Sequence, residues 1–302
     1  MTHAPGAWAW PDFGEAELVS RLLLPEPDFY ELWIGMMRQM PPREFSQDSF
    51  ATGTGYPWPR PDGSFVLTEG EGRMLADFEP EERFRLCGRL TGPRSGRTPM
   101  LAIGSNASPE GLWRKFAHFE NPEDRTLLAI RGQLEDFDVG ATAELALYGA
   151  LPATLFPSPG TRVSATAVWL TDAQLLQLTW AEIPYWIGRL ESRFDFEPEV
   201  ADLGATGLER ALVFVNRFGS FGPDGHPFAL AAIEAEGRTT PALSQVELLA
   251  RTAELVYGAG VSAEDLVRLA FETPGETGPR VAGVMRSISI PFESDRWTPF
   301  PG

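Results

Sequence analysis

Glu182 is the residue whose type and spacing best fit acid–base chemistry. Leu175, Leu178 and Glu182 lie at positions i, i+3 and i+7 of the stretch LLQLTWAE, so the carboxylate shares a helix face with two leucines. On a face turned to the core, burial disfavours the charged form and raises the pKa of the carboxyl, which suits a general acid–base near neutral pH. The same spacing also fits a carboxylate beyond the last helical turn that points into water.

A second candidate is the turn Gly104-Ser105-Asn106, which joins the apolar strand MLAI to a helix. Ser108 has the character of an N-cap, with Pro109 at the first helical position. Consecutive backbone N–H groups at such a turn can point to one centre and bind an anion. The motif is short, so it also fits a turn that only connects a strand to a helix.

Other reactive side chains give weaker signals. Arg189 follows Glu182 closely and is a candidate for a bidentate contact with a carboxylate, or for a surface ion pair on a strand. Asn216, Arg217 and His226 flank the glycine-rich turn GSFGPDG, and we interpret them first as loop residues. The three histidines are far apart, and the sequence contains no HExxH motif, CxxC motif or nucleophile elbow.

Composition and charge exclude several classes of protein. The 302 residues are 43% hydrophobic and 22% charged, and a net charge of −17 disfavours nucleic acid and anionic membranes as partners. No apolar run approaches the roughly 18–20 residues of a membrane span, and no signal peptide is visible, so we expect a cytoplasmic location. The single cysteine, Cys87, is expected in the core, and Lys115 is the only lysine, which leaves little room for lysine chemistry.

Residues 1–98 are predicted to form an N-terminal extension of helices and loops. Asp28 and Glu31 resemble a capping box at the start of its clearest helix, and residues 41–64 contain prolines and glycines at turn-like spacing. We expect this helix to pack on the domain of residues 100–260, because one amphipathic helix cannot enclose a core by itself. Its apolar stripe at helical spacing consists of Phe29, Leu32, Trp33, Met36, Met37 and Met40.

Residues 99–302 are predicted to form a strand-rich domain that ends in helices. The stretch ATLFPSPGTRVSATAVWL predicts a hairpin that turns at residues 157–160, and capping boxes begin helices at Thr171 and Ser244. Because the strands are short and not separated by long helices, they favour an α+β fold: a small, mixed, mostly antiparallel barrel or sheet with peripheral helices. Candidate strands are 99–103, 127–134, 144–149, 152–156, 163–170, 188–194 and 210–216.

The order of these motifs resembles the γ-glutamylcyclotransferase superfamily over about residues 99–260. That family has a YGSN loop after its first strand, an A-T-(apolar)-x-x-S-P-G turn and an L-x-x-L-x-x-x-E helix end. The matching stretches here are IGSN at 103–106, ATLFPSPG at 153–160 and LLQLTWAE at 175–182. The resemblance implies a β-barrel of that family's type.

The resemblance also implies a reaction. Glu182 falls at the catalytic glutamate of the family, which handles the proton of the substrate's α-amino group while this nitrogen attacks the γ-carbonyl and forms 5-oxoproline. Gly104, Ser105 and Asn106 match the loop whose backbone N–H groups hold the γ-glutamyl group. The expected partner is therefore a small γ-glutamyl amine or amino acid, and the intramolecular reaction requires neither a metal nor an organic cofactor.

The chain departs from the family at two points. Ile103 replaces the tyrosine before the glycine and lacks its hydroxyl at the pocket edge, and the extension 1–98 has no counterpart in the small members. Tyr185, Trp186 and Arg189 are further candidates to line the site. Three functions stay open: a lyase that releases 5-oxoproline, a hydrolase that uses water in place of the α-amine, and a non-catalytic binding protein on the same scaffold. The sequence does not determine the oligomeric state.

Overall fold

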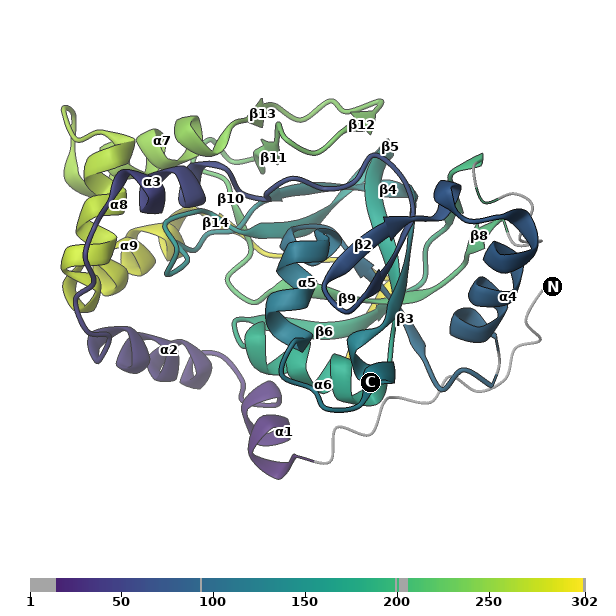
Figure 1. Cartoon of the computed structure of the whole chain (residues 1–302). Coiled ribbons are helices and arrows are strands. Elements are labelled where there is room, and N and C mark those ends of the chain that lie inside the picture. Colours follow the sequence, from purple (N-terminus) through teal and green to yellow (C-terminus); the bar gives the residue numbers. More distant parts are fainter. Residues whose placement is uncertain (1–14, 93, 199, 201–205, 301–302) are drawn as a thin grey trace.

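The computed structural model describes residues 15–92, 94–198, 200 and 206–300, and its centre is a large, mostly antiparallel sheet (Figure 1). Strands pair in the order β13-β11-β4-β5-β3-β9-β6-β15. The strands of this path are β3 (Thr98–Ala102), β4 (Leu127–Ala141), β5 (Ala153–Leu170), β6 (Tyr185–Leu190), β9 (Ala211–Asn216), β11 (Ala229–Leu230), β13 (Ala242–Leu243) and β15 (Trp297–Pro299).

Shorter strands extend the sheet or stand beside it. The hairpin of β1 and β2 pairs with β4, β7 joins β4 to β8, and β12 pairs with β5, whereas β10 and β14 form a separate ribbon. Their bounds are β1 (Phe65–Thr68), β2 (Glu71–Met74), β7 (Phe194–Phe196), β8 (Gly207–Leu208), β10 (Ser220–Phe221), β12 (Ala235–Glu236) and β14 (Ser289–Ile290).

Helices surround the sheet and cover both of its faces. Alternate residues of β4 enter two different apolar clusters, Leu128 and Ile130 one and Leu127 and Ala129 the other, so the sheet has a core on each side. The helices are α1 (Ala16–Leu22), α2 (Asp28–Arg38), α3 (Gln47–Thr54), α4 (Pro80–Thr91), α5 (Pro109–Phe116), α6 (Asp172–Ala181), α7 (Gln245–Tyr257), α8 (Ala263–Glu272) and α9 (Pro274–Ile288), with 3-10 turns at Leu75–Asp77, Ser105–Ala107 and Pro122–Arg125.

The α+β class is confirmed, but the expected closed barrel is not found. Within the described part of the chain the pairing path is open: it ends at β13 on one side and at β15 on the other, and these two strands do not pair. Closing a sheet requires its first and last strands to hydrogen-bond. Here each end of the path is a strand of only two or three residues: β13 pairs with the equally short β11, and β15 pairs with the longer β6.

The predicted hairpin at residues 157–160 is wrong. β5 is one continuous strand that pairs with β4 on both sides of this point. Phe137 pairs with Pro157 and Glu135 pairs with Arg162, so residues 158–161 form a bulge in β5. A bulge accommodates extra residues on one strand without reversing its direction, which is why turn-forming residues occur inside a strand. Residues 144–149, predicted as a strand, form a loop instead.

The predicted helix starts are mostly correct. The Ser108 hydroxyl caps α5, and Thr171 and Ser244 form complete capping boxes at α6 and α7. The capping box predicted at Asp28 is wrong, because α2 already begins at this residue and the N-cap is Pro27, which has no side-chain acceptor.

Helices α1 and α4 and the β1–β2 hairpin share the core of the sheet. In α2, Phe29 and Met37 of the predicted stripe are buried together with Ile34, outside both core clusters, and the helix packs on α9, which lies beyond residues 100–260 (Figure 1). The ring centroid of Phe29 lies 5.9 Å from that of Phe218. Cys87 of α4 is buried in the core, as expected. Among the described residues no helix is both long and apolar enough to cross a bilayer.

Candidate active site

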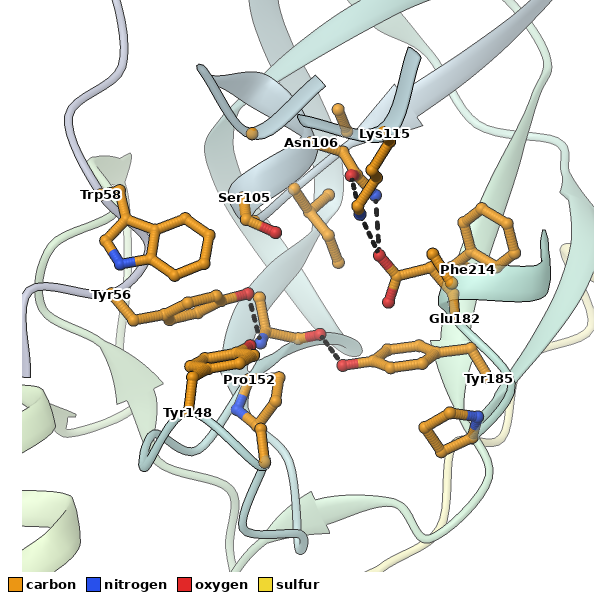
Figure 2. A pocket seen from close by; sticks show the side chains of 18 of the residues that line it. Tyr56, Trp58, Ser105, Asn106, Lys115, Tyr148, Pro152, Glu182, Tyr185 and Phe214 are labelled. Carbon is orange, nitrogen blue, oxygen red and sulfur yellow. Dashed lines mark hydrogen bonds and ion pairs between the residues drawn. The ribbon is translucent and has the colours of Figure 1, made fainter. Parts of the chain in front are cut away.

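A cavity of about 360 Å³ lies where β3 ends and the Gly104-Ser105-Asn106 turn begins. Five parts of the chain form its walls: the 101–106 segment with α5, the loop before β5, the end of α6 with the start of β6, Phe214 of β9, and aromatic side chains of the N-terminal extension (Figure 2). Glu182 and the 104–106 turn, singled out separately in the sequence, therefore border the same space.

The Glu182 carboxylate is part of a polar cluster with Asn106 and Lys115, which we call the Glu182 cluster. Its Oε1 accepts from Lys115 Nζ at 2.8 Å and from Asn106 Nδ2 at 3.2 Å. Lys115 Nζ also donates to Asn106 Oδ1 at 2.6 Å, so each member contacts the other two. Figure 2 shows the second carboxylate oxygen directed away from Asn106 and Lys115, toward the cavity.

Glu182 lies neither in an apolar wall nor in open water, which are the two surroundings that its spacing in the sequence allowed. The residue is the C-cap of α6, where its N–H donates to Leu178 O at 2.9 Å, and its side chain is only 19% exposed, so it does not point into open water. The expected apolar wall is also wrong, because the ammonium of Lys115 faces the carboxylate. Lys115, to which the sequence analysis gave no role, is thus part of the site.

The turn after β3 leaves backbone donors available. No main-chain carbonyl of the described residues accepts from the N–H groups of Gly104, Ser105 or Asn106. The Tyr56 hydroxyl lies near the Ser105 N–H. A Cβ on Gly104 would lie 2.3 Å from the Tyr56 hydroxyl and 3.0 Å from Ala153 Cβ, so a larger residue here would have to displace one of them. Among the described residues no acceptor pairs with the N–H groups of Gly104 and Asn106, so both are available to a ligand.

Tyr56 places a phenol hydroxyl in the cavity that Ile103 also lines, although Ile103 itself has no hydroxyl where the family has a tyrosine. Ile103 and Tyr56 both line the cavity, and the Tyr56 hydroxyl accepts from Ala153 N–H at 2.9 Å. Tyr185, predicted to line the site, does so and donates its hydroxyl to Ala153 O at 3.0 Å. Burial raises the pKa of Tyr56 and Tyr185 well above the usual range of a phenol, so both hydroxyls stay neutral.

Glu144 is a second cavity carboxylate, and the sequence analysis missed it. The residue is 4% exposed, and its Oε2 accepts from Asn216 Nδ2 at 2.8 Å. Burial raises the pKa of Glu144 to about 7; the Asn216 hydrogen bond opposes this rise, and the negative charge of Glu182 adds to it. Among the described residues no cation pairs with it. Glu144 follows β4 in a loop with no recognisable motif, so the only available signal was a lone acidic residue in an apolar stretch.

Aromatic rings form the wall that faces the Glu182 cluster, as Figure 2 shows. Tyr56 stacks on Tyr148 with ring centroids 5.8 Å apart, and Trp58 packs against both rings at 5.6 and 5.4 Å. Trp58 Nε1 donates to Thr52 O at 2.9 Å, which fixes the orientation of the indole. We call Tyr56, Trp58 and Tyr148 the aromatic wall. Its composition provides a rigid, largely apolar surface for part of a ligand.

Arg189 and Trp186 do not line the cavity, which corrects two expectations. Arg189 lies four residues beyond Tyr185 on β6, about 13 Å further along the strand, and pairs with Glu191 at 3.2 Å. Trp186 points to the opposite face, where the Arg217 guanidinium lies 3.5 Å from its ring centroid. The surface ion pair, weighed as the alternative for Arg189, is therefore the correct interpretation.

The residues around the glycine-rich turn have separate structural roles. Arg217 donates to the carbonyls of Leu22 and Leu24 and so holds the end of α1, while His226 lies in a loop. Asn216, interpreted as a loop residue, is instead the buried end of β9. Within the described part of the chain no group of three or more His, Cys, Asp or Glu side chains is placed to hold a metal.

Comparisons with known proteins give a weak structural likeness. No protein-family model and no curated protein matches the chain. A solved γ-glutamyl cyclotransferase aligns with 40% of this chain and 66% of its own, at 18% identity and a TM-score of 0.28. An uncharacterized protein from Homo sapiens aligns with 40% of this chain and 67% of its own, at 16% identity and a TM-score of 0.27. The first neighbour bears the name of the superfamily that the order of the sequence motifs resembles.

Proposed function

We propose that the protein releases 5-oxoproline from a γ-glutamyl amine or amino acid, with Glu182 as the general acid–base. The observation that carries the proposal is the hydrogen bond between Asn106 Nδ2 and Glu182 Oε1, 3.2 Å long. This bond fixes Glu182, the candidate base, next to the 104–106 turn, whose backbone N–H groups would hold the substrate. A proton acceptor and a set of anion-binding donors then border one enclosed space.

The reaction requires a nucleophile that the substrate itself carries. The α-ammonium transfers a proton to the Glu182 carboxylate, and the resulting amine attacks the γ-carbonyl carbon, forming the ring C–N bond. The bond from this carbon to the leaving nitrogen then breaks as that nitrogen receives a proton from Glu182. Over the whole reaction two protons leave the α-ammonium and two reach the leaving amine, so no co-reactant is consumed.

The backbone donors of the turn have a defined part in this scheme. The N–H groups of Gly104 and Asn106, free of main-chain acceptors, are assigned to the γ-carbonyl oxygen, on which negative charge develops as the ring closes. Lys115 and the Asn106 side chain hold the Glu182 carboxylate at one oxygen and leave the other for the proton. The aromatic wall is assigned to the leaving group, because it faces the Glu182 cluster across the cavity (Figure 2).

A non-catalytic binding protein is the second candidate function. It is favoured by the ion pair that engages Glu182. In this case the cavity would hold a γ-glutamyl compound without converting it.

The test is 5-oxoproline release from a panel of γ-glutamyl amines and amino acids. Glu182→Gln keeps the shape and hydrogen-bonding capacity of the side chain but cannot accept a proton at neutral pH, so we expect a loss of about 10²–10⁴-fold. Ser105→Ala retains the backbone N–H and is expected to be milder. Glu254→Gln changes an exposed glutamate of α7 and serves as the matched control. Full activity in Glu182→Gln refutes the assigned base, and silence of the folded wild type across the panel favours the binding protein.

A further inference from the structure

The Glu144 carboxylate is held in place by a partner that cannot neutralise it. Asn216 Oδ1 accepts from the Phe218 N–H at 2.9 Å, which leaves its Nδ2 to donate to Glu144 Oε2 at 2.8 Å. The Asn216 backbone N–H donates to Thr154 Oγ1 at 3.0 Å and anchors the residue at the end of β9. Two hydrogen bonds thus orient the side-chain amide, the backbone bond anchors the residue, and Asn216 presents a neutral donor to a buried carboxylate.

Among the described side chains that line the cavity, Glu144 is the charged group without an oppositely charged partner. Lys115 pairs with Glu182, and Arg114 at the rim pairs with Glu110 outside the cavity. Glu144 has a single side-chain hydrogen bond, and its Oε1 accepts none from the described residues. A buried carboxylate without a cation is unfavourable, whereas a cation that enters the cavity removes this cost and gains a strong ion pair.

We propose that Glu144 is the binding site for a primary ammonium group, and that it holds the α-ammonium of the substrate beside Glu182. This inference rests on the proposed function and assigns the two carboxylates different tasks. Glu144 binds the ammonium as a carboxylate, a form that the ligand's positive charge stabilises, while the free oxygen of Glu182 takes the proton. The site then selects amines by charge: an analogue in which hydrogen replaces the α-amino group leaves Glu144 without a partner.

The experiment compares two ligands that differ only in the amine. Isothermal titration calorimetry measures the affinity of γ-glutamyl anilide and of glutaryl anilide, which lacks the α-amine, for Glu182→Gln, in which turnover is blocked. We expect the amine-bearing ligand to bind on the order of 30-fold more tightly or better, as for a buried charge pair. Adding Glu144→Gln, which keeps an acceptor for Asn216 Nδ2, should abolish this preference, whereas Glu144→Asp retains the charge and should keep part of it.

The outcomes separate this inference from the proposed function. An amine preference that persists in a folded Glu144→Gln variant overturns the inference, as does an equal loss in the Gln and Asp variants, since charge then plays no part. If the preference depends on Glu144 but the wild type releases no 5-oxoproline, the proposed function fails and the ammonium site stands.

Discussion

The two carboxylates of the cavity have the same chemistry but opposite surroundings. Glu182 is partly exposed and faces an ammonium group, with one oxygen engaged and the other turned to the cavity. Glu144 is buried, receives one neutral donor and faces no cation among the described residues. The difference shows how one cavity can contain a carboxylate placed to exchange protons and another placed to hold charge, because environment decides the role of each group.

Removing residues 1–98 is expected to have the largest effect, because it deletes Tyr56 and Trp58 from the cavity that contains both carboxylates, together with part of the hydrophobic core. Tyr56 of the aromatic wall and Leu90 of α4 belong to the same core cluster as β4 and β5, and β1 pairs with β4. We expect residues 99–302 alone to aggregate or to lose the cooperative thermal transition seen by calorimetry in the full chain. A soluble fragment with a cooperative transition would show the extension to be dispensable for folding.

The stability of Glu144→Gln should depend on pH. Because the carboxyl pKa is raised from 4.5 to about 7 in the folded protein, ionisation destabilises the wild type above pH 7 by roughly 3 kcal/mol. This cost diminishes as pH falls from 7 toward 4.5 and disappears below 4.5, where the carboxyl is protonated in both the folded and the unfolded forms. The glutamine variant carries no charge, so its free energy of unfolding should exceed that of the wild type at pH 8 and approach it near pH 4.5.

Urea unfolding at pH 8, 6.5 and 5 measures this difference. Glu254→Gln, at an exposed position, is the control and should show no comparable trend. If the difference in free energy of unfolding between Glu144→Gln and the wild type were the same at all three pH values, Glu144 would not be a buried carboxylate without a compensating cation.

Gly104→Ala should reduce stability by a smaller amount, through a contact between the 104–106 turn and Tyr56 of the aromatic wall. The new Cβ would meet the Tyr56 hydroxyl at 2.3 Å, and relief of such a clash costs about 1–3 kcal/mol of stability. Tyr56→Phe removes the clashing oxygen, so the double variant should recover part of the loss measured by urea unfolding. Gly283→Ala in α9, where nothing lies within 4 Å, is the matched control and should be neutral or slightly stabilising. Purely additive effects of Gly104→Ala and Tyr56→Phe would argue against the contact.

The Glu182 side of the cavity could be predicted from the sequence because its signals are local. The glycine turn, the cap at Ser108 and the helix that ends at Glu182 each occupy one short stretch, and their order matched a known pattern. Lys115 was missed although it lies one residue from the end of α5, because the sequence does not show which helix face turns to the cavity.

The other side of the cavity depends on contacts between distant segments. Tyr56 hydrogen-bonds to Ala153, and Asn216 hydrogen-bonds to Glu144; the partners are far apart in sequence, so no local pattern predicts these contacts. The open sheet was missed for a related reason, since closure depends on which strands meet at the edges. The bulge in β5 was read as a turn because proline and glycine serve both structures.

The most direct measurement follows the nitrogen of the substrate. A γ-glutamyl anilide carrying ¹⁵N in its α-amino group is incubated with the full chain, and the product is identified by NMR. If the α-amine is the nucleophile, the label appears in the ring N–H of 5-oxoproline and one aniline is released for each ring formed. Labelled glutamate as the product, or recovery of unchanged substrate from folded protein, would contradict the account.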